Sequence, residues 1–308
     1  MTRTWFITGA NRGLGRAFTE AALAQGDRVV ATARNPRSMA DLDGDRLTVL
    51  PLDVRDRDRV IATVNQAFEV AGSIDVIVNN AGYGLVGALE ELTEAQIRDQ
   101  MDTNFYGALW VSQAAVPHLR KQGSGHIVQI STVGAVGSLP LFSMYNASKW
   151  ALEGFSASLA DELRPFGIAV TLAQMGGFDT DWAKSSMKFA TADPAYSEVR
   201  TGILGMPDYP DAAMLAAAAE QSGPDADTAE SDTAGTEANA AGAETDAAEP
   251  EWREAAPEVG AAALIELVNM PNPPLRKVIG PGAHQMVAMA LDQRRQDYLT
   301  DPGFAWPA

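Results

Sequence analysis

Seven short apolar runs recur along this chain of 308 residues, and helix-like segments separate most of them. The runs are apolar throughout instead of alternating with polar residues, as strands are when helices cover both faces of a parallel sheet. The predicted strands are 4–8, 28–33, 47–52, 75–79, 126–131, 169–174 and 276–279, and the predicted helices include 15–25, 56–70, 94–121 and 148–166. The pattern therefore predicts a single doubly wound α/β domain with a parallel sheet.

The alternation stops at about residue 207, where alanine, acidic residues, threonine and glycine replace the large apolar residues. Residues 208–258 carry 14 acidic residues and one basic residue, so they account for −13 of the net charge of −17 and leave −4 for the rest. Such a composition buries too little apolar area to offset the entropy lost on ordering. We predict a domain formed by 1–206 and 259–308, interrupted in its lid region by an acidic, alanine-rich insertion, 207–258, that is largely disordered.

The composition also argues against several classes of function. The chain has no cysteine, and its three histidines lack ligand spacing, so we expect no metal site. An acidic chain does not suit nucleic-acid binding. No apolar run is long enough to span a membrane, so we expect no membrane partner and a soluble, cytoplasmic protein.

Three glycines, Gly9, Gly13 and Gly15, follow the first predicted strand and open the first predicted helix. Glycine allows a tight turn and a close approach of the backbone to a pyrophosphate, whose charge the helix N-terminus stabilises. The spacing predicts a dinucleotide site within a strand–helix–strand unit, with a purely structural turn as the alternative.

The end of the second predicted strand indicates which dinucleotide binds. The segment "VVATARNP" places Arg34 where a carboxylate would bind a ribose 2′-hydroxyl. A guanidinium suits a 2′-phosphate, and Arg12 in the glycine loop adds a second cation. We therefore predict NADP(H); a surface arginine without a function is the alternative.

The segment "YNASK" places Tyr145 and Lys149 four residues apart, on one face of a helix. A nearby ammonium lowers the pKa of a phenol toward the range useful for acid–base catalysis. Ser131 ends a predicted strand, where its hydroxyl could donate to a substrate carbonyl. Asn104 lies within the predicted helix 94–121, and a buried amide bonded to backbone is the alternative to a functional one.

Together these motifs resemble the short-chain dehydrogenase/reductase family. The matching segments are "TGANRGLG" at 8–15, Asp53-Val54, "NNAG" at 79–82, Asn104, Ser131, "YNASK" at 145–149 and "GGFDT" at 176–180. They follow the order of the family and cover about residues 4–182. The resemblance implies a Rossmann-type fold and NADP(H)-dependent hydride transfer between the nicotinamide and a small-molecule carbonyl or alcohol.

The resemblance also implies a role for each catalytic residue. Tyr145 is expected to protonate the carbonyl oxygen in reduction and to accept the proton in oxidation. Lys149 is expected to lower the pKa of Tyr145 and to bind the nicotinamide ribose. Ser131 is expected to orient and polarise the carbonyl, and Asn104 to hold a water molecule in a proton relay.

The cofactor contacts follow from the same resemblance. Asp53 and Val54 resemble adenine contacts, and Thr180 resembles the residue that holds the nicotinamide carboxamide. The full expected set is Gly9, Asn11, Arg12, Gly13, Leu14, Gly15, Arg34, Asp53, Val54, Asn80, Ala81, Gly82, Tyr145, Lys149, Gly176 and Thr180. The chain departs from the family at Met175, which replaces the usual proline, and we expect a less restrained loop there.

The substrate is less well defined by the sequence. An apolar pocket is predicted by the segment "FDTDWAKSSMKFA" at 178–190 in the lid region and by Leu139, Leu141, Phe142 and Met144. "VVATARNP" and "GGFDTDW" resemble the branch with steroid, retinoid and broad carbonyl substrates, so a ketone, an aldehyde or a steroid-like compound fits. The alternatives are a non-catalytic NADP(H)-binding regulator and an epimerase or dehydratase. Helices 94–121 and 148–166 resemble those that pair subunits in the family, as a homodimer or homotetramer.

Overall fold

The computed structural model of the chain describes residues 2–42, 44–179, 186–211, 214–215 and 254–305. The predicted acidic insertion falls mainly on 216–253, outside the described residues, and its disorder stays a prediction. The C-terminal part of the domain resumes at Pro257, slightly before the predicted boundary at residue 259.

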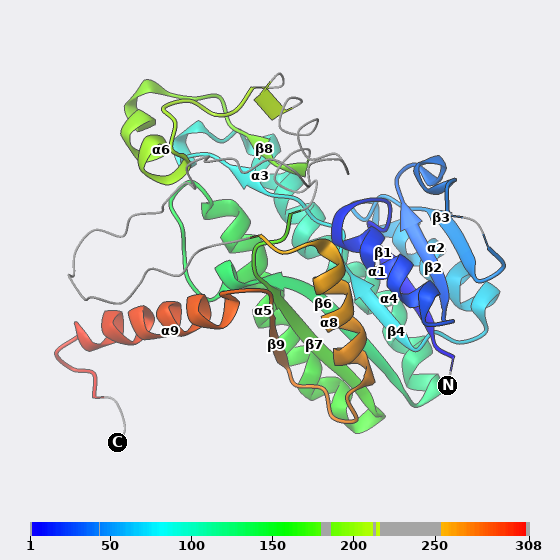
Figure 1. Cartoon of the computed structure of the whole chain (residues 1–308). Coiled ribbons are helices and arrows are strands. Elements are labelled where there is room, and N and C mark those ends of the chain that lie inside the picture. Colours follow the sequence, from blue (N-terminus) through cyan, green and yellow to red (C-terminus); the bar gives the residue numbers. More distant parts are fainter. Residues whose placement is uncertain (1, 43, 180–185, 212–213, 216–253, 306–308) are drawn as a thin grey trace, which may run out of the picture.

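A seven-stranded sheet forms the centre of the molecule (Figure 1). The strand order is β3-β2-β1-β4-β6-β7-β9, and every neighbouring pair is parallel. The strands are β1 (Thr4–Thr8), β2 (Arg28–Ala33), β3 (Leu47–Pro51), β4 (Val76–Asn79), β6 (Gly125–Thr132), β7 (Ile168–Met175) and β9 (Arg276–Ile279). The structure confirms the predicted parallel sheet, and each predicted strand is present with small shifts at its ends.

Helices cover both faces of this sheet because neighbouring residues of each strand point to opposite faces. On β1, Trp5 and Ile7 belong to one hydrophobic cluster and Phe6 to another. The first cluster includes residues of α1 (Gly13–Ala24) and α8 (Pro257–Asn269), which pack on each other. The second lies beneath α2 (Arg57–Ala71), α4 (Gly107–Gln122) and α5 (Ser143–Leu163). This arrangement is the doubly wound Rossmann-type fold.

The predicted helix 94–121 is divided in the structure. It consists of α3 (Glu94–Met101), a π-helical turn (Asp102–Tyr106) and α4. The predicted helix 148–166 begins earlier, at Ser143, and ends in a 3₁₀ turn (Arg164–Phe166). Tyr145 therefore lies on the same helix as Lys149, as the spacing predicts.

A second, small sheet lies above the main one (Figure 1). It pairs β5 (Leu85–Val86) with β8 (Lys188–Phe189), and α6 (Ser197–Leu204) follows. We refer to residues 186–211 as the lid. The two strands of the small sheet, β5 and β8, have two residues each, which is too short to give a periodic signal in the sequence. They were therefore not predicted.

The lid is anchored by an ion pair whose side chains are almost fully buried. Arg200 Nη1 donates to Glu91 Oε1 at 2.5 Å, and the two side chains are 1% and 0% exposed. Arg200 also donates to the backbone oxygens of Pro207 and Asp193, and Tyr209 donates to Glu91. These bonds fix the lid backbone to the 3₁₀ turn Leu89–Glu91.

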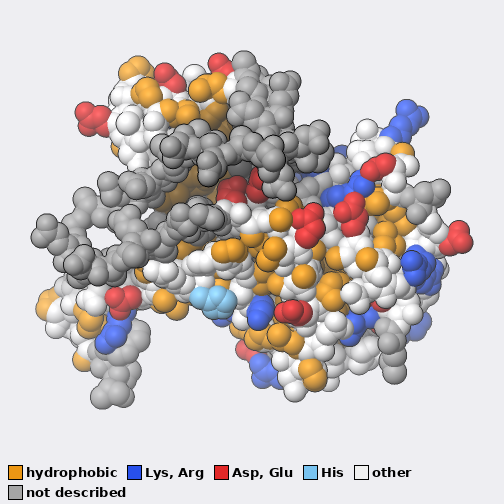
Figure 2. Space-filling view, in the orientation of Figure 1, with side chains coloured by type: hydrophobic (Ala, Val, Ile, Leu, Met, Phe, Trp, Pro, Cys, Tyr) orange, Lys and Arg blue, Asp and Glu red, His pale blue; other side chains and the backbone are white. Residues whose placement is uncertain are grey.

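The last helix, α9 (Ala283–Leu299), extends away from the sheet (Figure 1). No helix in the described part of the chain has both the length and the apolar character needed to cross a membrane. Figure 2 shows hydrophobic side chains gathered over α8 and charged side chains of both signs elsewhere on this face. This mixture agrees with the small net charge that the sequence leaves to the chain outside 208–258.

We predict that Arg200→Met lowers the free energy of unfolding of the lid by about 3–5 kcal/mol, because it leaves the Glu91 carboxylate buried without its cation. Thermal unfolding and hydrogen exchange of the lid amides measure the loss. Arg98→Met is the matched control, since Arg98 pairs with Glu94 while 72% exposed and should change stability by less than about 1 kcal/mol. Equal stabilities of the two variants would contradict the prediction.

Candidate active site

The glycine loop joins β1 to α1 at the carboxyl edge of the sheet. Gly9 and Gly13 adopt positive φ angles of 62° and 51°, which L side chains rarely take. Gly15 has a different role, because a Cβ atom there would lie 2.3 Å from the Gly9 oxygen and 2.4 Å from Asn80 Nδ2. Asn80 Nδ2 itself donates to the backbone oxygens of Thr8 and Gly9, at 2.9 and 3.1 Å. The loop is therefore packed tightly against the end of β4, with the first turn of α1 beside it.

A cavity of about 670 Å³ extends from this loop along the carboxyl edge of the sheet. Its wall includes Ser131 and every predicted cofactor residue that the structure describes. These residues are Gly9, Asn11, Arg12, Gly13, Leu14, Gly15, Arg34, Asp53, Val54, Asn80, Ala81, Gly82, Tyr145, Lys149 and Gly176. Thr180 lies outside the described residues, so its predicted contact stays untested. The glycine loop offers close backbone approach and the helix N-terminus offers N–H donors, which fit the phosphates of a dinucleotide.

At the end of β2, Arg34, Asn35 and Ser38 line the same cavity. Asn35 caps the 3₁₀ turn Pro36–Met39 by accepting from the Arg37 N–H, which turns the chain away after the strand. Arg34 is exposed and lines the cavity, and β2 itself contributes no carboxylate there. The Asp53 carboxylate lines the same cavity after β3, and its pKa is lowered first by the hydrogen bonds from Arg55 and further by the charge of Arg34.

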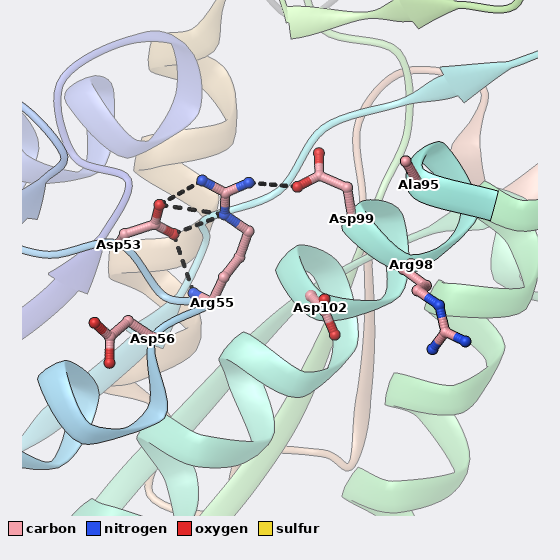
Figure 3. Close-up of a pocket in the computed structure, with 7 residues that line it drawn as sticks. All are labelled: Asp53, Arg55, Asp56, Ala95, Arg98, Asp99 and Asp102. Carbon is pink, nitrogen blue, oxygen red and sulfur yellow. Dashed lines mark hydrogen bonds and ion pairs between the residues drawn. The ribbon is translucent and has the colours of Figure 1, made fainter. Parts of the chain in front are cut away.

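Beside Asp53 lies an ionic cluster that the sequence did not predict (Figure 3). Arg55 donates to both oxygens of Asp53 and to Asp99 Oδ1, the latter at 2.5 Å. The hydrogen bonds from Arg55 hold the pKa of Asp53 below its usual value. These side chains line a smaller pocket of about 380 Å³ that opens next to the main cavity. Arg55 lies two residues after Asp53, so the sequence could have indicated this pair. It could not indicate the contact between Arg55 and Asp99 of α3.

Asp99 connects this cluster to the lid. Its Oδ2 accepts from Tyr83 Oη at 2.8 Å and from Lys188 Nζ at 2.7 Å. Burial alone would raise the pKa of Asp99, but the bonds from Lys188, Arg55 and Tyr83 lower it to about 2. The carboxylate stays charged across the neutral range. It binds Arg55, which follows β3, and Lys188 of the lid at the same time.

Tyr145 and Lys149 lie one turn apart on α5 and face the cavity. Lys149 Nζ donates to the Ile130 backbone oxygen at 2.7 Å. Burial lowers the pKa of Lys149 to about 8, against the opposing charge of Glu153. Burial raises the pKa of Tyr145 to about 12, and a hydrogen bond with Thr132 acts in the opposite direction.

The direction of the Tyr145 shift differs from the one that the sequence predicted. An ammonium beside a phenol lowers the phenol pKa, but removing the phenolate from water raises it. In this structure desolvation is the larger effect, and the Lys149 ammonium is directed toward Ile130. Tyr145 is a protonated phenol at neutral pH, as a free tyrosine is, and burial makes it a weaker acid in this structure.

Ser131 is the last residue but one of β6, pairs with Gln174 of β7 and is 2% exposed. Its Oγ donates to Glu153 Oε1 at 2.7 Å. The predicted donation from Ser131 to a substrate carbonyl would require this bond to break. Sequence reasoning missed Glu153, although it follows Lys149 by four residues and so shares its face of the helix.

Asn104 lies in the π-helical turn and is 2% exposed. Its Oδ1 accepts from the Tyr83 N–H at 3.0 Å, and its Nδ2 donates to the Tyr83 oxygen at 2.9 Å. The structure thus shows the buried amide bonded to backbone that was the alternative to a functional residue. Nδ2 also lies 3.2 Å from Ser148 Oγ on α5, so Asn104 connects this turn to the helix that carries Tyr145.

Met175, which stands where the family pattern has a proline, is the last residue of β7, and the loop after the strand begins at Gly176. The Gly176 N–H donates to the Ile279 oxygen of β9 at 2.8 Å. Further along, the Ala255 N–H donates to the Gly177 oxygen and the Asp179 N–H to the Ala255 oxygen. Backbone hydrogen bonds thus connect this loop to β9 and to Ala255 up to residue 179, and the expected effect of Met175 in place of proline stays a prediction.

Four of the residues expected to form an apolar pocket, Leu139, Leu141, Phe142 and Met144, do not line the main cavity. Leu141 is buried and packs with Phe142 against Val86 and the lid, while Leu139 is 42% exposed. Phe178 of the predicted segment does line the cavity, and the Phe142 ring meets the Tyr145 ring edge-on with centroids 6.3 Å apart, so the apolar pocket itself stays a prediction. The apolar side chains that do line it include Leu14, Ile130, Met175 and Phe178.

Comparison with known proteins agrees with this site. A family model described as short chain dehydrogenase matches residues 3–190. Oxidoreductase BOA17 of Botryotinia fuckeliana is 44% identical over 200 residues, which cover 64% of this chain and 73% of that protein. The 3-ketodihydrosphingosine reductase of Bacteroides thetaiotaomicron is 40% identical, covering 56% and 63%, and retinol dehydrogenase 8 of Bos taurus is 36% identical, covering 62% and 66%.

Two solved structures are also similar. A short-chain dehydrogenase from Streptomyces avermitilis has a TM-score of 0.77 at 31% identity, covering 97% of this chain and 95% of that chain. A metagenomic short-chain oxidoreductase in complex with NADP has a TM-score of 0.54 at 28% identity, covering 57% and 81%.

We predict that Gly15→Ala weakens dinucleotide binding by about tenfold or more, because the new methyl group must displace the Gly9 carbonyl and the Asn80 amide. Overpacking of this kind costs about 1–3 kcal/mol. Fluorescence titration with NADPH measures the affinity, and thermal unfolding measures the stability. Gly154→Ala on α5 is the matched control, since a Cβ there meets no atom within 4 Å. Unchanged NADPH affinity in Gly15→Ala would refute this reading of the loop.

Proposed function

The chain belongs to the short-chain dehydrogenase family, and on this premise we propose that it is an NADP(H)-dependent oxidoreductase acting on an apolar carbonyl or alcohol. One observation carries the proposal: a single cavity is lined by the glycine loop, by Arg34 at one end and by Ser131, Tyr145 and Lys149 at the other. The relatives act as oxidoreductases, and one similar structure is a complex with NADP.

The residues present fit this cofactor. The backbone of the glycine loop and the first turn of α1 would hold the pyrophosphate, and Arg34 with Arg12 would hold the 2′-phosphate. Asp53 and Val54 would lie at the adenine, and Lys149 would lie at the nicotinamide ribose. When bound, the nicotinamide supplies or accepts the hydride.

The proton step is assigned to Tyr145. A phenol is protonated at neutral pH, so Tyr145, which lines the cavity, can donate a proton to the substrate oxygen during reduction. In the opposite direction the phenolate form must accept the proton from the alcohol. Lys149, which is buried beside Tyr145 on α5, favours that phenolate by its positive charge.

The proposed substrate class rests on the lining of the cavity and on the names of two similar proteins. Apolar side chains such as Leu14 and Phe178 line the cavity next to the polar groups. Two of the similar proteins are named for lipid-like substrates, a retinol and a 3-ketodihydrosphingosine. We therefore propose a long or polycyclic apolar ketone, aldehyde or alcohol, to be tested by loss of NADPH absorbance with a panel of such compounds.

Arg34→Asp should reverse the preference for NADPH over NADH. A carboxylate repels the 2′-phosphate and accepts from a 2′-hydroxyl, and a charge-assisted bond is worth about 1.5–3 kcal/mol, or roughly 10- to 100-fold in kcat/KM. Arg28→Asp makes the same charge change at the other end of β2 and should leave the preference unchanged. Equal kcat/KM values for the two cofactors in the parent protein would exclude the role given to Arg34.

Tyr145→Phe should lower kcat by about 10²- to 10⁴-fold while NADPH affinity stays nearly constant, because the phenol transfers a proton and the ring remains. Steady-state kinetics and fluorescence titration measure the two quantities. Tyr298→Phe removes a phenol that is 54% exposed and serves as the control. A parent protein that binds NADPH but turns over no member of the panel would instead support a nucleotide-binding regulator.

A further inference from the structure

Leu141 has an unusual backbone conformation just before the helix that carries Tyr145. Among the residues that the structure describes, it is the one residue other than glycine with a positive φ angle, at 68°. An L side chain disfavours the left-handed region by about 5- to 30-fold at a single residue, because Cβ approaches the following carbonyl oxygen. Such a conformation persists only where the surrounding structure holds it.

Contacts from two directions hold Leu141 in this conformation. Its side chain is 5% exposed and forms a hydrophobic cluster with Val86 and Ala88, and its oxygen accepts from the Gly87 N–H at 2.8 Å. Six lid residues pack against this cluster: Met187, Phe189, Tyr196, Ile203, Leu204 and Tyr209. Burying a leucine side chain favours the folded arrangement by about 10- to 100-fold, which is enough to offset the left-handed backbone. The lid therefore helps to hold Leu141 in its strained conformation.

The chain enters α5 directly after Leu141. Phe142 precedes the helix without a side-chain cap, and its oxygen accepts from the Asn146 N–H at 2.8 Å. The Phe142 ring packs on the same cluster and meets the Tyr145 ring edge-on, with centroids 6.3 Å apart. Tyr145 lies in the first turn of α5, where N–H groups have no acceptor within the helix. Its position therefore depends on how the chain enters the helix.

The beginning of the same loop is held by contacts that do not involve the lid. Trp150 Nε1 of α5 donates to the Gly137 oxygen at 3.2 Å, and Arg294 Nη2 of α9 donates to the Val136 oxygen at 2.9 Å. A change of backbone conformation is therefore expected to stay within residues 138–142, next to the start of α5.

We propose that Leu141 is a positioning residue whose left-handed backbone, held by the packing of the lid, sets the first turn of α5 and so the place of the Tyr145 phenol in the cavity. When the lid packing is lost, Leu141 relaxes to a negative φ and Tyr145 is displaced. Proton transfer is thereby linked to a docked lid. This inference rests on the proposed oxidoreductase function, and Leu141 is not among the described residues that line the cavity.

Leu141→Ile and Leu141→Gly separate the effect of the backbone from that of the side chain. Isoleucine keeps the apolar volume, but its branched Cβ strongly disfavours a positive φ. Glycine loses the side chain but adopts a positive φ readily. We expect Leu141→Ile to lower kcat by about tenfold, Leu141→Gly to keep a higher kcat than Leu141→Ile, and the NADPH affinity to stay nearly constant in both.

A residue that only packs would give the opposite order of kcat values. Isoleucine would then be close to the parent and glycine would be the more impaired variant, and this order would overturn the proposal. If one of the two variants does not fold, Leu141→Ala takes the place of Leu141→Ile and Leu141→Asn that of Leu141→Gly. Asparagine adopts a positive φ more readily than alanine, so Leu141→Asn should keep the higher kcat.

Ile203→Ala tests the link to the lid, because Ile203 packs against the Leu141 cluster. It should lower kcat severalfold in the parent but have little effect in the Leu141→Gly background, since glycine keeps a positive φ without that packing. Val199→Ala is the matched control, because Val199 lies on the same helix α6 while 40% exposed, and it should leave kcat unchanged in both backgrounds. An equal loss from Ile203→Ala in both backgrounds would overturn the proposal.

Hydrogen exchange of the Asn146 amide reports on the first turn of α5 without any turnover. Leu141→Ile and Ile203→Ala should each speed this exchange, and in the Leu141→Gly background Ile203→Ala should no longer change it. A parent protein that shows this pattern but turns over no substrate would refute the proposed function and leave the link between the lid and α5 established. Exchange that Leu141→Ile does not alter would overturn the proposal.

Discussion

The parallel, in-register pairing of β1, β4, β6 and β7 is the constraint on which the site depends. Ile7 pairs with Val78, Asn79 with Gln129, and Ser131 with Gln174. The carboxyl ends of these strands therefore lie at one edge, where the loops after them meet. A shift of one residue would turn every strand side chain to the other face, and both faces are buried against helices. Hydrophobic burial thus fixes the register, and the register brings the glycine loop to Ser131.

The parts that sequence reasoning could predict are those determined over short distances along the chain. Apolar runs predicted the strands, because a strand with two buried faces must be apolar throughout. The glycines predicted the turn after β1, and the spacing of Tyr145 and Lys149 predicted their common helix face. These signals need only the chain's own periodicity and the conformational freedom of glycine.

The remaining parts depend on contacts between distant residues. Glu153 and Arg276 are separated by 123 positions, and neither shows its partner in the sequence. Leu141 and Phe142 were assigned to the substrate pocket because they are apolar and near the motifs, but they pack under the lid. The Tyr145 pKa was predicted in the wrong direction because proximity to an ammonium can be seen in a sequence, whereas the extent of burial cannot. The sign of such a shift depends on which of two opposing effects is larger.

Two ion pairs connect the lid to the rest of the domain, and they differ in how far their side chains are buried. Arg200 pairs with Glu91 and also donates to backbone oxygens of the lid, and both side chains are shielded from water. The rim contact between Lys188 and Asp99 involves side chains that are 55% and 22% exposed. Exposed pairs contribute little because water screens them, whereas breaking a buried pair leaves an uncompensated charge. Separating the Lys188–Asp99 contact is therefore expected to cost less free energy than breaking the Arg200–Glu91 pair.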